Sequence, residues 1–222
     1  MPLQVIGCEV VPQLLARLMA EARVVAPHRR TGADQWAYAE VNDPCEVELE
    51  YISTILPAKK YAFPPVEQLV RYELAERPLM EAVVESEPLV IFGAHPCDIH
   101  GLWALDQAFC DVNVDPNYTA HRSGMRIVGV DCVPDKYCFC GSMGTATPAD
   151  GFDLFLTVVE GGYLAETGTE AGAAMLDGLP SQEASAAALA QAKERLARRI
   201  QQTTRVSAEC HSLPLLLSGL AD

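Results

Sequence analysis

The sequence of 222 residues is long enough for one large domain or two small ones, and its 50% hydrophobic and 21% charged residues exclude wholesale disorder. Acidic residues outnumber basic ones by 30 to 16, and the resulting net charge of -14 argues against a nucleic-acid-binding protein, because phosphate backbones require a basic surface. No apolar run reaches the roughly 18 residues of a membrane-spanning helix, and no basic residue precedes the apolar N-terminal stretch as in a secretory signal. We therefore expect a cytoplasmic protein without a membrane span.

The N-terminal third of the chain predicts two helices and a hairpin. Apolar residues at helical spacing over 11–22 predict a helix with one buried face. Two alternating segments, 35–41 and 46–52, are separated by turn-forming residues and predict a β-hairpin. A proline-rich loop follows at 57–65, and the apolar spacing over 66–86, interrupted by a proline, predicts a kinked or split helix.

The middle of the chain predicts a βαβ unit. Residues 88–93 and 126–131 are short continuous apolar runs, as expected of strands that are covered on both faces. A helix fits residues 97–109 between them. Two strands joined by a helix within about 45 residues predict parallel pairing. We expect the α/β class, with α+β as the alternative: an open mixed sheet with a parallel βαβ unit, helices on its faces and peripheral β-hairpins.

The last third predicts another hairpin and a long helix. Segments 153–160 and 163–166 are joined by two glycines, which indicates a hairpin. Residues 183–203 are rich in alanine and other helix formers and carry an apolar stripe. We predict an α/β domain over 1–180 and a C-terminal helical extension over 181–222.

Four of the eight cysteines have the pattern of a ligand set. Cys138 and Cys140 form a C-x-C pair, Cys132 precedes them by six residues, and Cys97 lies in the segment GAHPCDIHG. A chain of this length with so few cysteines is not a disulfide scaffold, and a reducing cytoplasm keeps thiols free. We interpret the other four as small buried hydrophobic side chains: Cys8, Cys45, Cys110 and Cys210.

The βαβ prediction brings the four thiols together. Sites in parallel sheets form beyond the carboxyl ends of the strands, and Cys97 and Cys132 each follow one of the two predicted strands closely. Four thiolates suit an iron–sulfur cluster or tetrahedral zinc. Structural zinc sites usually pair cysteines as C-x₂₋₄-C, so the C-x-C pair slightly favours a cluster. A thiol enzyme with Cys97 as the nucleophile and a histidine as its base, and an adaptor that has lost its cluster, remain alternatives.

Several neighbouring residues have two interpretations each. For His95 and His100 we favour capping or a satisfied core contact over metal ligation. Phe139 lies between two candidate ligands, where it either shields a cluster from water or is an ordinary core aromatic. The polar segment DPNYTAHR (115–122) either lines the site or a partner surface, or forms a structural ion pair.

Five segments between residues 57 and 172 carry the pattern of one family. They are PAKKYAFPPVEQL (57–69), VIFGAHPCDIHGLWALDQAF (90–109), DPNYTAHR (115–122), IVGVDCVPDKYCFCGSMGT (127–145) and GFDLFLTVVEGGYLAETGTEAG (151–172). Together they resemble the β subunit of the cytoplasmic sulfhydrogenases, which are nickel–iron hydrogenases and sulfur reductases. One of the subunits of anaerobic sulfite reductase is a relative of this family.

The resemblance implies an electron-transfer subunit that is not itself catalytic. The family works beside two kinds of partner: a flavin- and NAD(P)-binding subunit, and a catalytic hydrogenase or reductase subunit. Its N-terminal part is α/β, and a ferredoxin-like part with two [4Fe-4S] clusters follows. Matched motif by motif, the resemblance implies that Cys97, Cys132, Cys138 and Cys140 bind an additional [4Fe-4S] cluster. The alternative function is a zinc-stabilised α/β interaction module without redox activity.

The sequence departs from the family at its C-terminal end. The ferredoxin motif C-x₂-C-x₂-C-x₃-C-P is absent, and residues 181–222 lead toward the place of the missing module. The chain is then either a piece of a longer protein or the product of a split or truncated gene, completed by a separate ferredoxin chain. Only the one N-terminal cluster is expected here.

Overall fold

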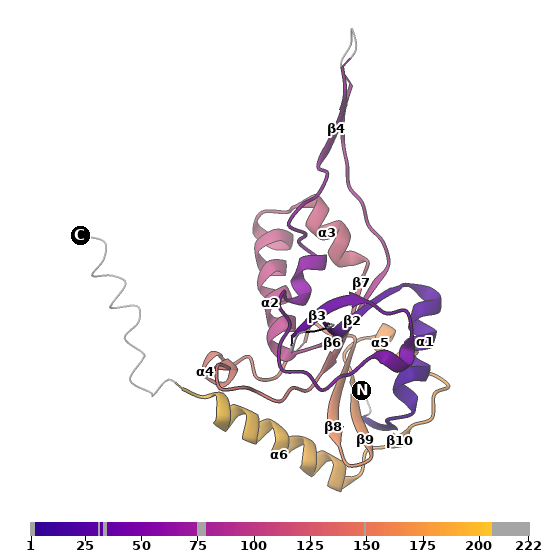
Figure 1. Cartoon of the computed structure of the whole chain (residues 1–222), viewed down its shortest axis with the longest axis vertical. Helices are drawn as coiled ribbons and strands as arrows, with labels where there is room; N and C mark the ends of the chain where they lie inside the picture. Colours follow the sequence, from indigo (N-terminus) through magenta and orange to yellow (C-terminus); the bar gives the residue numbers. More distant parts are fainter. Residues whose placement is uncertain (1–2, 31, 33–34, 75–78, 149, 206–222) are drawn as a thin grey trace, which may run out of the picture.

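The computed structural model describes residues 3–30, 32, 35–74, 79–148 and 150–205. An eight-stranded sheet forms its centre, and a two-stranded ribbon projects from the body (Figure 1). In chain order the strands are β1 (Gln4–Gly7), β2 (Arg23–Arg29), β3 (Trp36–Glu40), β4 (Val70–Glu73), β5 (Leu79–Ala82), β6 (Leu89–Ala94), β7 (Met125–Val130), β8 (Leu154–Val159), β9 (Gly162–Thr167) and β10 (Gln182–Glu183). The helices are α1 (Val10–Glu21), α2 (Pro96–Asp106), α3 (Pro116–Ser123), α4 (Cys140–Met143), α5 (Glu170–Leu176) and α6 (Ala186–Thr203), with short 3₁₀ turns at Pro44–Glu46 and Ala58–Tyr61 and a π-helical turn at Gln107–Val112.

The large sheet is mixed, with the strand order β10-β1-β9-β8-β7-β6-β2-β3. Its centre is parallel, because β2 pairs with β6, β6 with β7 and β7 with β8 in the same direction. The outer strands pair antiparallel, including the hairpin of β8 and β9. The α/β class with an open mixed sheet, the parallel unit β6–α2–β7 and the hairpin at 154–167 are therefore confirmed.

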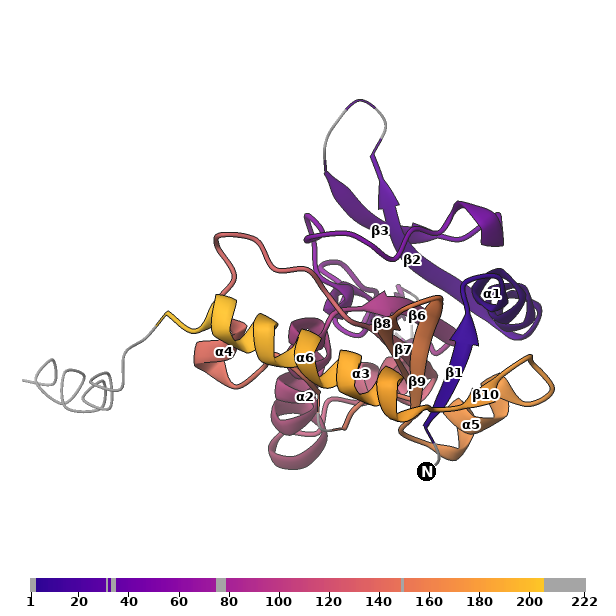
Figure 2. The ribbon, with the colours of Figure 1, turned by 90° about the horizontal axis from the view of Figure 1, so that it is seen from below.

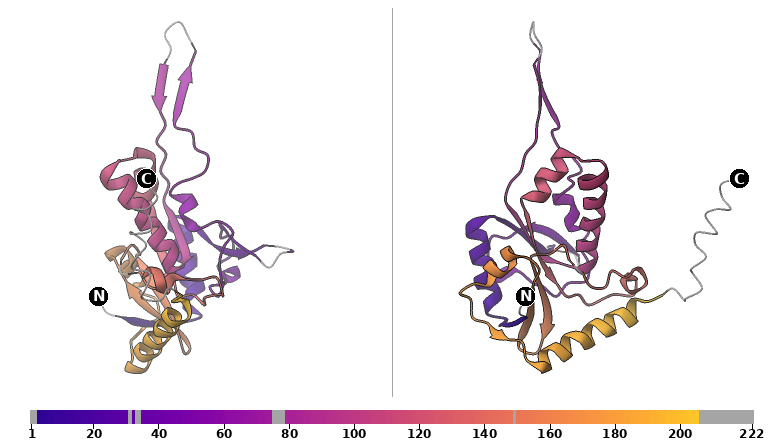
Figure 3. Two further views of the ribbon diagram at one scale, coloured as in Figure 1. Left: turned by 90° about the vertical axis from the view of Figure 1, so that its left-hand side faces the viewer. Right: turned by 180° about the vertical axis from the view of Figure 1, so that it is seen from behind.

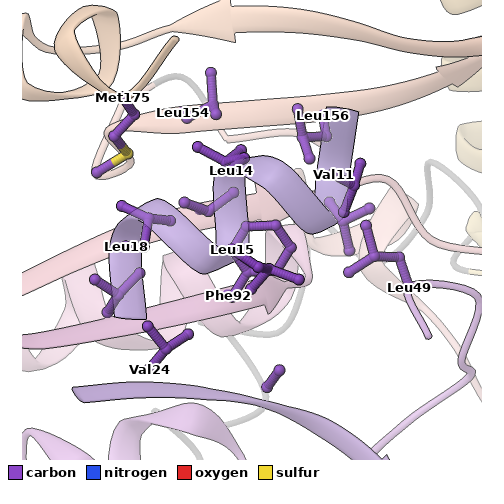
Figure 4. Close-up of a cluster of buried hydrophobic side chains, with 14 of the residues drawn as sticks. Val11, Leu14, Leu15, Leu18, Val24, Leu49, Phe92, Leu154, Leu156 and Met175 are labelled. Carbon is purple, nitrogen blue, oxygen red and sulfur yellow. The ribbon is translucent and has the colours of Figure 1, made fainter. Parts of the chain in front are cut away.

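The central strands bury both faces, which explains their continuous apolar sequences. In β6, Phe92 packs into the cluster under α1, whereas its neighbour Ile91 packs into the cluster under α2 and α3. The predicted N-terminal helix is confirmed as α1, and its Leu14, Leu15 and Leu18 side chains point toward Phe92 and the strands of the sheet (Figure 4). The apolar periodicity of α1 thus packs this helix on the face of the sheet opposite to α2.

The predicted hairpin of 35–41 and 46–52 is wrong in its second half. β3 forms within the first segment, but it pairs antiparallel with β2, not with residues 46–52. The sequence of β2, RVVAPHR, contains Pro27 and two arginines, which conceal its strand character. Residues 46–52 instead run irregularly and bury Leu49 and Tyr51 against the core.

The predicted kinked helix over 66–86 is also wrong. The segment forms the antiparallel ribbon of β4 and β5, which extends away from the body in both views of Figure 3. Every described residue of these two strands is exposed. An apolar spacing predicts a helix only where a core covers its apolar face, and here no part of the described chain packs over the ribbon's strands.

The C-terminal helix is confirmed as α6, which lies across one end of the large sheet (Figures 1 and 2). Residues 206–222, including Cys210 and the remainder of the predicted extension, lie outside the described residues. The division into 1–180 and 181–222 stays a prediction. None of the helices in the described ranges is both long and apolar enough to cross a membrane.

The packing of α1 predicts a large loss of stability when one of its core side chains is shortened. Leu14 is fully buried against the sheet, so Leu14→Ala should lower the free energy of unfolding by about 2–5 kcal/mol through lost burial and a cavity. Urea denaturation measures this change. The matched control is Leu74→Ala, because Leu74 is 90% exposed; equal losses from both variants would contradict this core.

Candidate cysteine site at the sheet edge

Two of the predicted site residues follow neighbouring parallel strands. β6 ends at Ala94, and Cys97 is the second residue of α2. β7 ends at Val130, and Cys132 follows two residues later. Because β6 and β7 pair in parallel, both cysteines lie beyond the same edge of the sheet, as the sequence predicted.

The loop after β7 brings the other two cysteines to the same place. Cys138 and Cys140 lie on this loop, and α4 begins at Cys140. All four cysteines line one cavity with a volume of about 360 Å³, which we call the cysteine cavity. Cys97 is exposed there, and the other three are half-buried. The juxtaposition that the sequence predicted is present.

The surroundings of two of the four cysteines strongly disfavour the thiolate form. Burial is the main cause that raises the pKa of Cys132 to about 12, and the thiols of Cys97, Cys140 and Cys138 add to the shift. Cys97 is exposed at the cavity, but the protein atoms packed around its thiol, and then the carboxylate of Asp98, raise the pKa of Cys97 to about 12. Burial therefore favours the protonated form of both thiols, and a bound metal group would lower both pKa values by stabilising the thiolates.

The donor set suits a thiolate-bound metal group. Zinc takes thiolate ligands at about 2.3 Å from a single point. Within the part of the chain that the structure describes, no three His, Cys, Asp or Glu side chains form a ready-made site for one metal ion. A [4Fe-4S] cluster takes four cysteine thiolates, one on each iron, so its ligands spread around a larger volume. Four thiols around the cysteine cavity fit that requirement.

A buried ion pair ties the cavity to α6. Asp131, the residue before Cys132, is 1% exposed in its side chain and accepts a hydrogen bond from Arg195 Nε at 2.6 Å. Arg199, one helical turn further along α6, also forms an ion pair with Asp131 and is 5% exposed. Two arginines share one carboxylate, which satisfies the buried charge of Asp131.

The last turn of α6 holds the cysteine loop directly, and α4 lies beside it (Figure 2). Thr203 Oγ1 accepts a hydrogen bond from the backbone N–H of Gly141 at 2.9 Å and from the Cys140 thiol at 3.4 Å. A Cβ at Gly141 would lie 2.5 Å from a backbone oxygen of α6, so only glycine permits this approach. Arg205 Nε donates to the carbonyl of Cys138 at 2.7 Å.

His95 occupies the wall of the cavity at the start of α2. Its ring stacks on Tyr51 with centroids 3.8 Å apart, and Tyr51 Oη donates to the Gly93 carbonyl at 2.7 Å. Gly93 has a φ of +82°, which lets β6 bulge at this point. Burial, and then the charge of Arg199, lower the pKa of His95 to about 3. An imidazole with so low a pKa is a poor proton acceptor, so the arrangement does not favour His95 as the base of a thiol enzyme.

The interpretation as a cap or a satisfied contact holds for His100 but not for His95. His100 Nε2 forms a hydrogen bond with the Thr147 carbonyl at 2.9 Å, which is a satisfied structural contact. His95 lies at the N-cap of α2 but makes no side-chain capping bond. Its Nε2 has no hydrogen-bond partner among the described residues.

Residues 115–122 have a structural role away from the cavity. Asp115 accepts hydrogen bonds from two backbone N–H groups and caps α3. Tyr118 Oη donates to Asp106 at 2.6 Å, and Arg122 Nε donates to the same carboxylate at 3.0 Å. His121 bonds to a glutamate carboxylate at 2.6 Å. The interpretation of this segment as a structural ion pair is confirmed.

The core positions expected for the other cysteines, and considered for Phe139, are not what the structure shows for most of them. Cys8 and Cys45 are exposed, so the expectation that they are buried is wrong for both, because each lies in a surface turn rather than in an apolar run. Cys110 is half-buried. Phe139 lines the cavity and is 57% exposed, so it is not a core aromatic.

Sequence reasoning missed the groups of α6 that hold the site. Asp131, Arg199 and Thr203 are all buried, and Asp131 lies far from the other two in the chain. One signal was present: Arg195 and Arg199 are four residues apart on a helix, so both lie on one face. A search of the strand ends for a carboxylate that pairs with both arginines could have found Asp131.

Comparison with known proteins supports the family resemblance. The chain is 37% identical over 164 residues to a protein named sulfhydrogenase 2 subunit beta from Pyrococcus furiosus. The match covers 74% of this chain and 48% of that relative, so the chain spans about half the length of the curated relative it matches. The resemblance to sulfhydrogenase β subunits is confirmed. No protein-family model matches the chain.

The buried ion pair predicts a strong effect of its acidic partner on stability. Asp131→Asn would leave the buried Arg199 charge without its anion and should lower the free energy of unfolding by about 3–5 kcal/mol. The matched control is Glu194→Gln, which breaks the exposed pair of Glu194 and Arg198 and should change stability by less than about 1 kcal/mol. Urea midpoints of the two variants measure the contrast, and comparable midpoints would refute the ion pair's importance.

Proposed function

We propose that this chain is the electron-transfer part of a multi-subunit oxidoreductase of the hydrogenase and sulfur or sulfite reductase type. In this proposal Cys97, Cys132, Cys138 and Cys140 hold one [4Fe-4S] cluster. The observation that carries the proposal is the gathering of these four thiols, from two separate segments, around a single cavity. The similarity to a sulfhydrogenase β subunit supports the same conclusion.

The positions of the four cysteines support the proposed cluster site. When bound, a [4Fe-4S] cluster supplies one-electron transfer. The protein holds the four ligands from two rigid sources, because Cys97 belongs to α2 and Cys140 begins α4, which Thr203 fastens to α6. The chain thus positions the ligands on packed elements, which keeps the distance between the redox group and its surroundings constant.

The rim of the cavity is apolar and supports docking of an electron donor or acceptor. Tyr137, Phe139 and Met143 are 73%, 57% and 64% exposed, and all three line the cavity. Ile52 adds a fourth exposed apolar side chain from a separate segment of the chain. An apolar rim excludes water when a partner covers it. The partners in this proposal are a flavin- and NAD(P)-binding subunit, a catalytic hydrogenase or reductase subunit, and a separate ferredoxin chain, in the cytoplasm.

Removal of one candidate ligand should abolish cluster binding. Cys138→Ser should lose the visible absorbance and the EPR signal of the reconstituted cluster, since serine is a poor ligand for iron–sulfur clusters. Cys45→Ser is the matched control, because Cys45 is exposed and does not line the cavity. Equal loss from both variants, or loss from neither, would refute the ligand assignment.

Metal content separates the cluster from the alternative zinc-stabilised module. The chain, purified without oxygen, should contain about four iron and four acid-labile sulfide per molecule and show a broad absorbance band that bleaches on reduction. One zinc and no sulfide would instead support the interaction module without redox activity. The absence of both, after reconstitution, would favour an adaptor.

A further inference from the structure

We propose that His95 and Arg199 are positioning residues that form a positively polarised wall of the cysteine cavity and raise the reduction potential of the cluster held there. The inference rests on the proposed function. It concerns two buried side chains that are not candidate ligands. His95 lines the cavity at the start of α2, and Arg199 of α6 is outside that lining but pairs with Asp131, the residue before Cys132.

The ring of His95 presents an unpaired polar atom at the cavity. His95 is only 4% exposed and lines the cavity with the four cysteines. Its stacking on Tyr51 fixes the plane of the ring, and Tyr51 is itself anchored to the Gly93 carbonyl. Within the described residues His95 Nε2 has no hydrogen-bond partner. A buried polar atom without a partner is rare, and in the tautomer with its proton on Nε2 the ring would donate a hydrogen bond to a sulfur atom in the cavity.

Arg199 supplies a permanent positive charge close to the same thiols. Its side chain is 5% exposed and forms an ion pair with Asp131, the residue before Cys132, and its charge helps to lower the pKa of His95. Asp131 balances only part of this charge, because Arg195 pairs with the same carboxylate. Asp98 and Asp135 also line the cavity, so the buried Arg199 charge offsets acidic groups beside the thiols.

The effect of such a wall on reduction has a definite sign. Reduction adds one negative charge to a cluster that four thiolates already make anionic. A hydrogen bond to sulfur and a nearby buried cation both stabilise the reduced state more than the oxidised state. Loss of either group should therefore shift the reduction potential to more negative values.

The test compares the reduction potentials of four proteins with reconstituted clusters: the wild type and three variants. His95→Phe keeps an aromatic ring to stack on Tyr51 but removes the nitrogen, and Arg199→Gln removes the charge. Arg198→Gln is the matched control, because Arg198 is the neighbouring residue of α6 and is 65% exposed. Iron and sulfide are assayed in each protein, and an EPR-monitored redox titration gives the potential. We expect more negative potentials for His95→Phe and Arg199→Gln, and the wild-type value for Arg198→Gln.

The outcomes separate this inference from the proposed function. A wild-type chain that takes up no iron or sulfide overturns both. If the wild type, His95→Phe and Arg199→Gln all take up the cluster and have the same reduction potential, the wall is refuted and the proposed function stands. If Arg199→Gln does not fold, His95→Phe decides: a more negative potential supports the wall, and an unchanged one refutes it. A shift in Arg198→Gln as large as in the other two also refutes it, since any charge change would then suffice.

Discussion

The parallel pairing of β6 with β7 is the constraint on which the rest of the site depends. Their register places Cys97 and Cys132 beyond one edge of the sheet, although 35 positions separate them in the chain. Both strands are buried on both faces, so a slip would move side chains such as Ile91 and Ile127 from one packed core into the other, where the neighbouring side chains leave no matching space. The hydrophobic core under α1 and α2 therefore fixes where the thiols emerge, and the site inherits the rigidity of the sheet.

The central sheet and the four cysteines could be predicted because their signals are local. The apolar runs at 88–93 and 126–131 match β6 and β7 closely, and the strand ends indicated the place of Cys97 and Cys132. The failures arose where tertiary structure overrides a local pattern. Pro27 conceals the strand that β3 pairs with, and the apolar spacing over 66–86 belongs to a ribbon that never meets a core.

The chemistry around the thiols was harder to predict than the thiols themselves. The contact between Thr203 and Gly141 joins residues 62 positions apart, and no sequence spacing encodes it. The same holds for Asp131 and Arg199, whose charges compensate each other only after α6 has packed on the sheet edge. Cysteine patterns reveal candidate ligands, whereas the electrostatic environment of a site is a property of the packed fold.

The fastening of the cysteine loop by α6 has a consequence for the order of events during synthesis. The four thiols leave the ribosome well before Thr203, which lies 63 residues after Cys140. Until α6 has emerged and packed, Gly141 lacks its hydrogen-bond acceptor and Asp131 lacks both arginines. The nascent chain therefore presents Cys138 and Cys140 on a loop that is not yet fastened, and only the arrival of α6 fixes this loop in its place at the sheet edge.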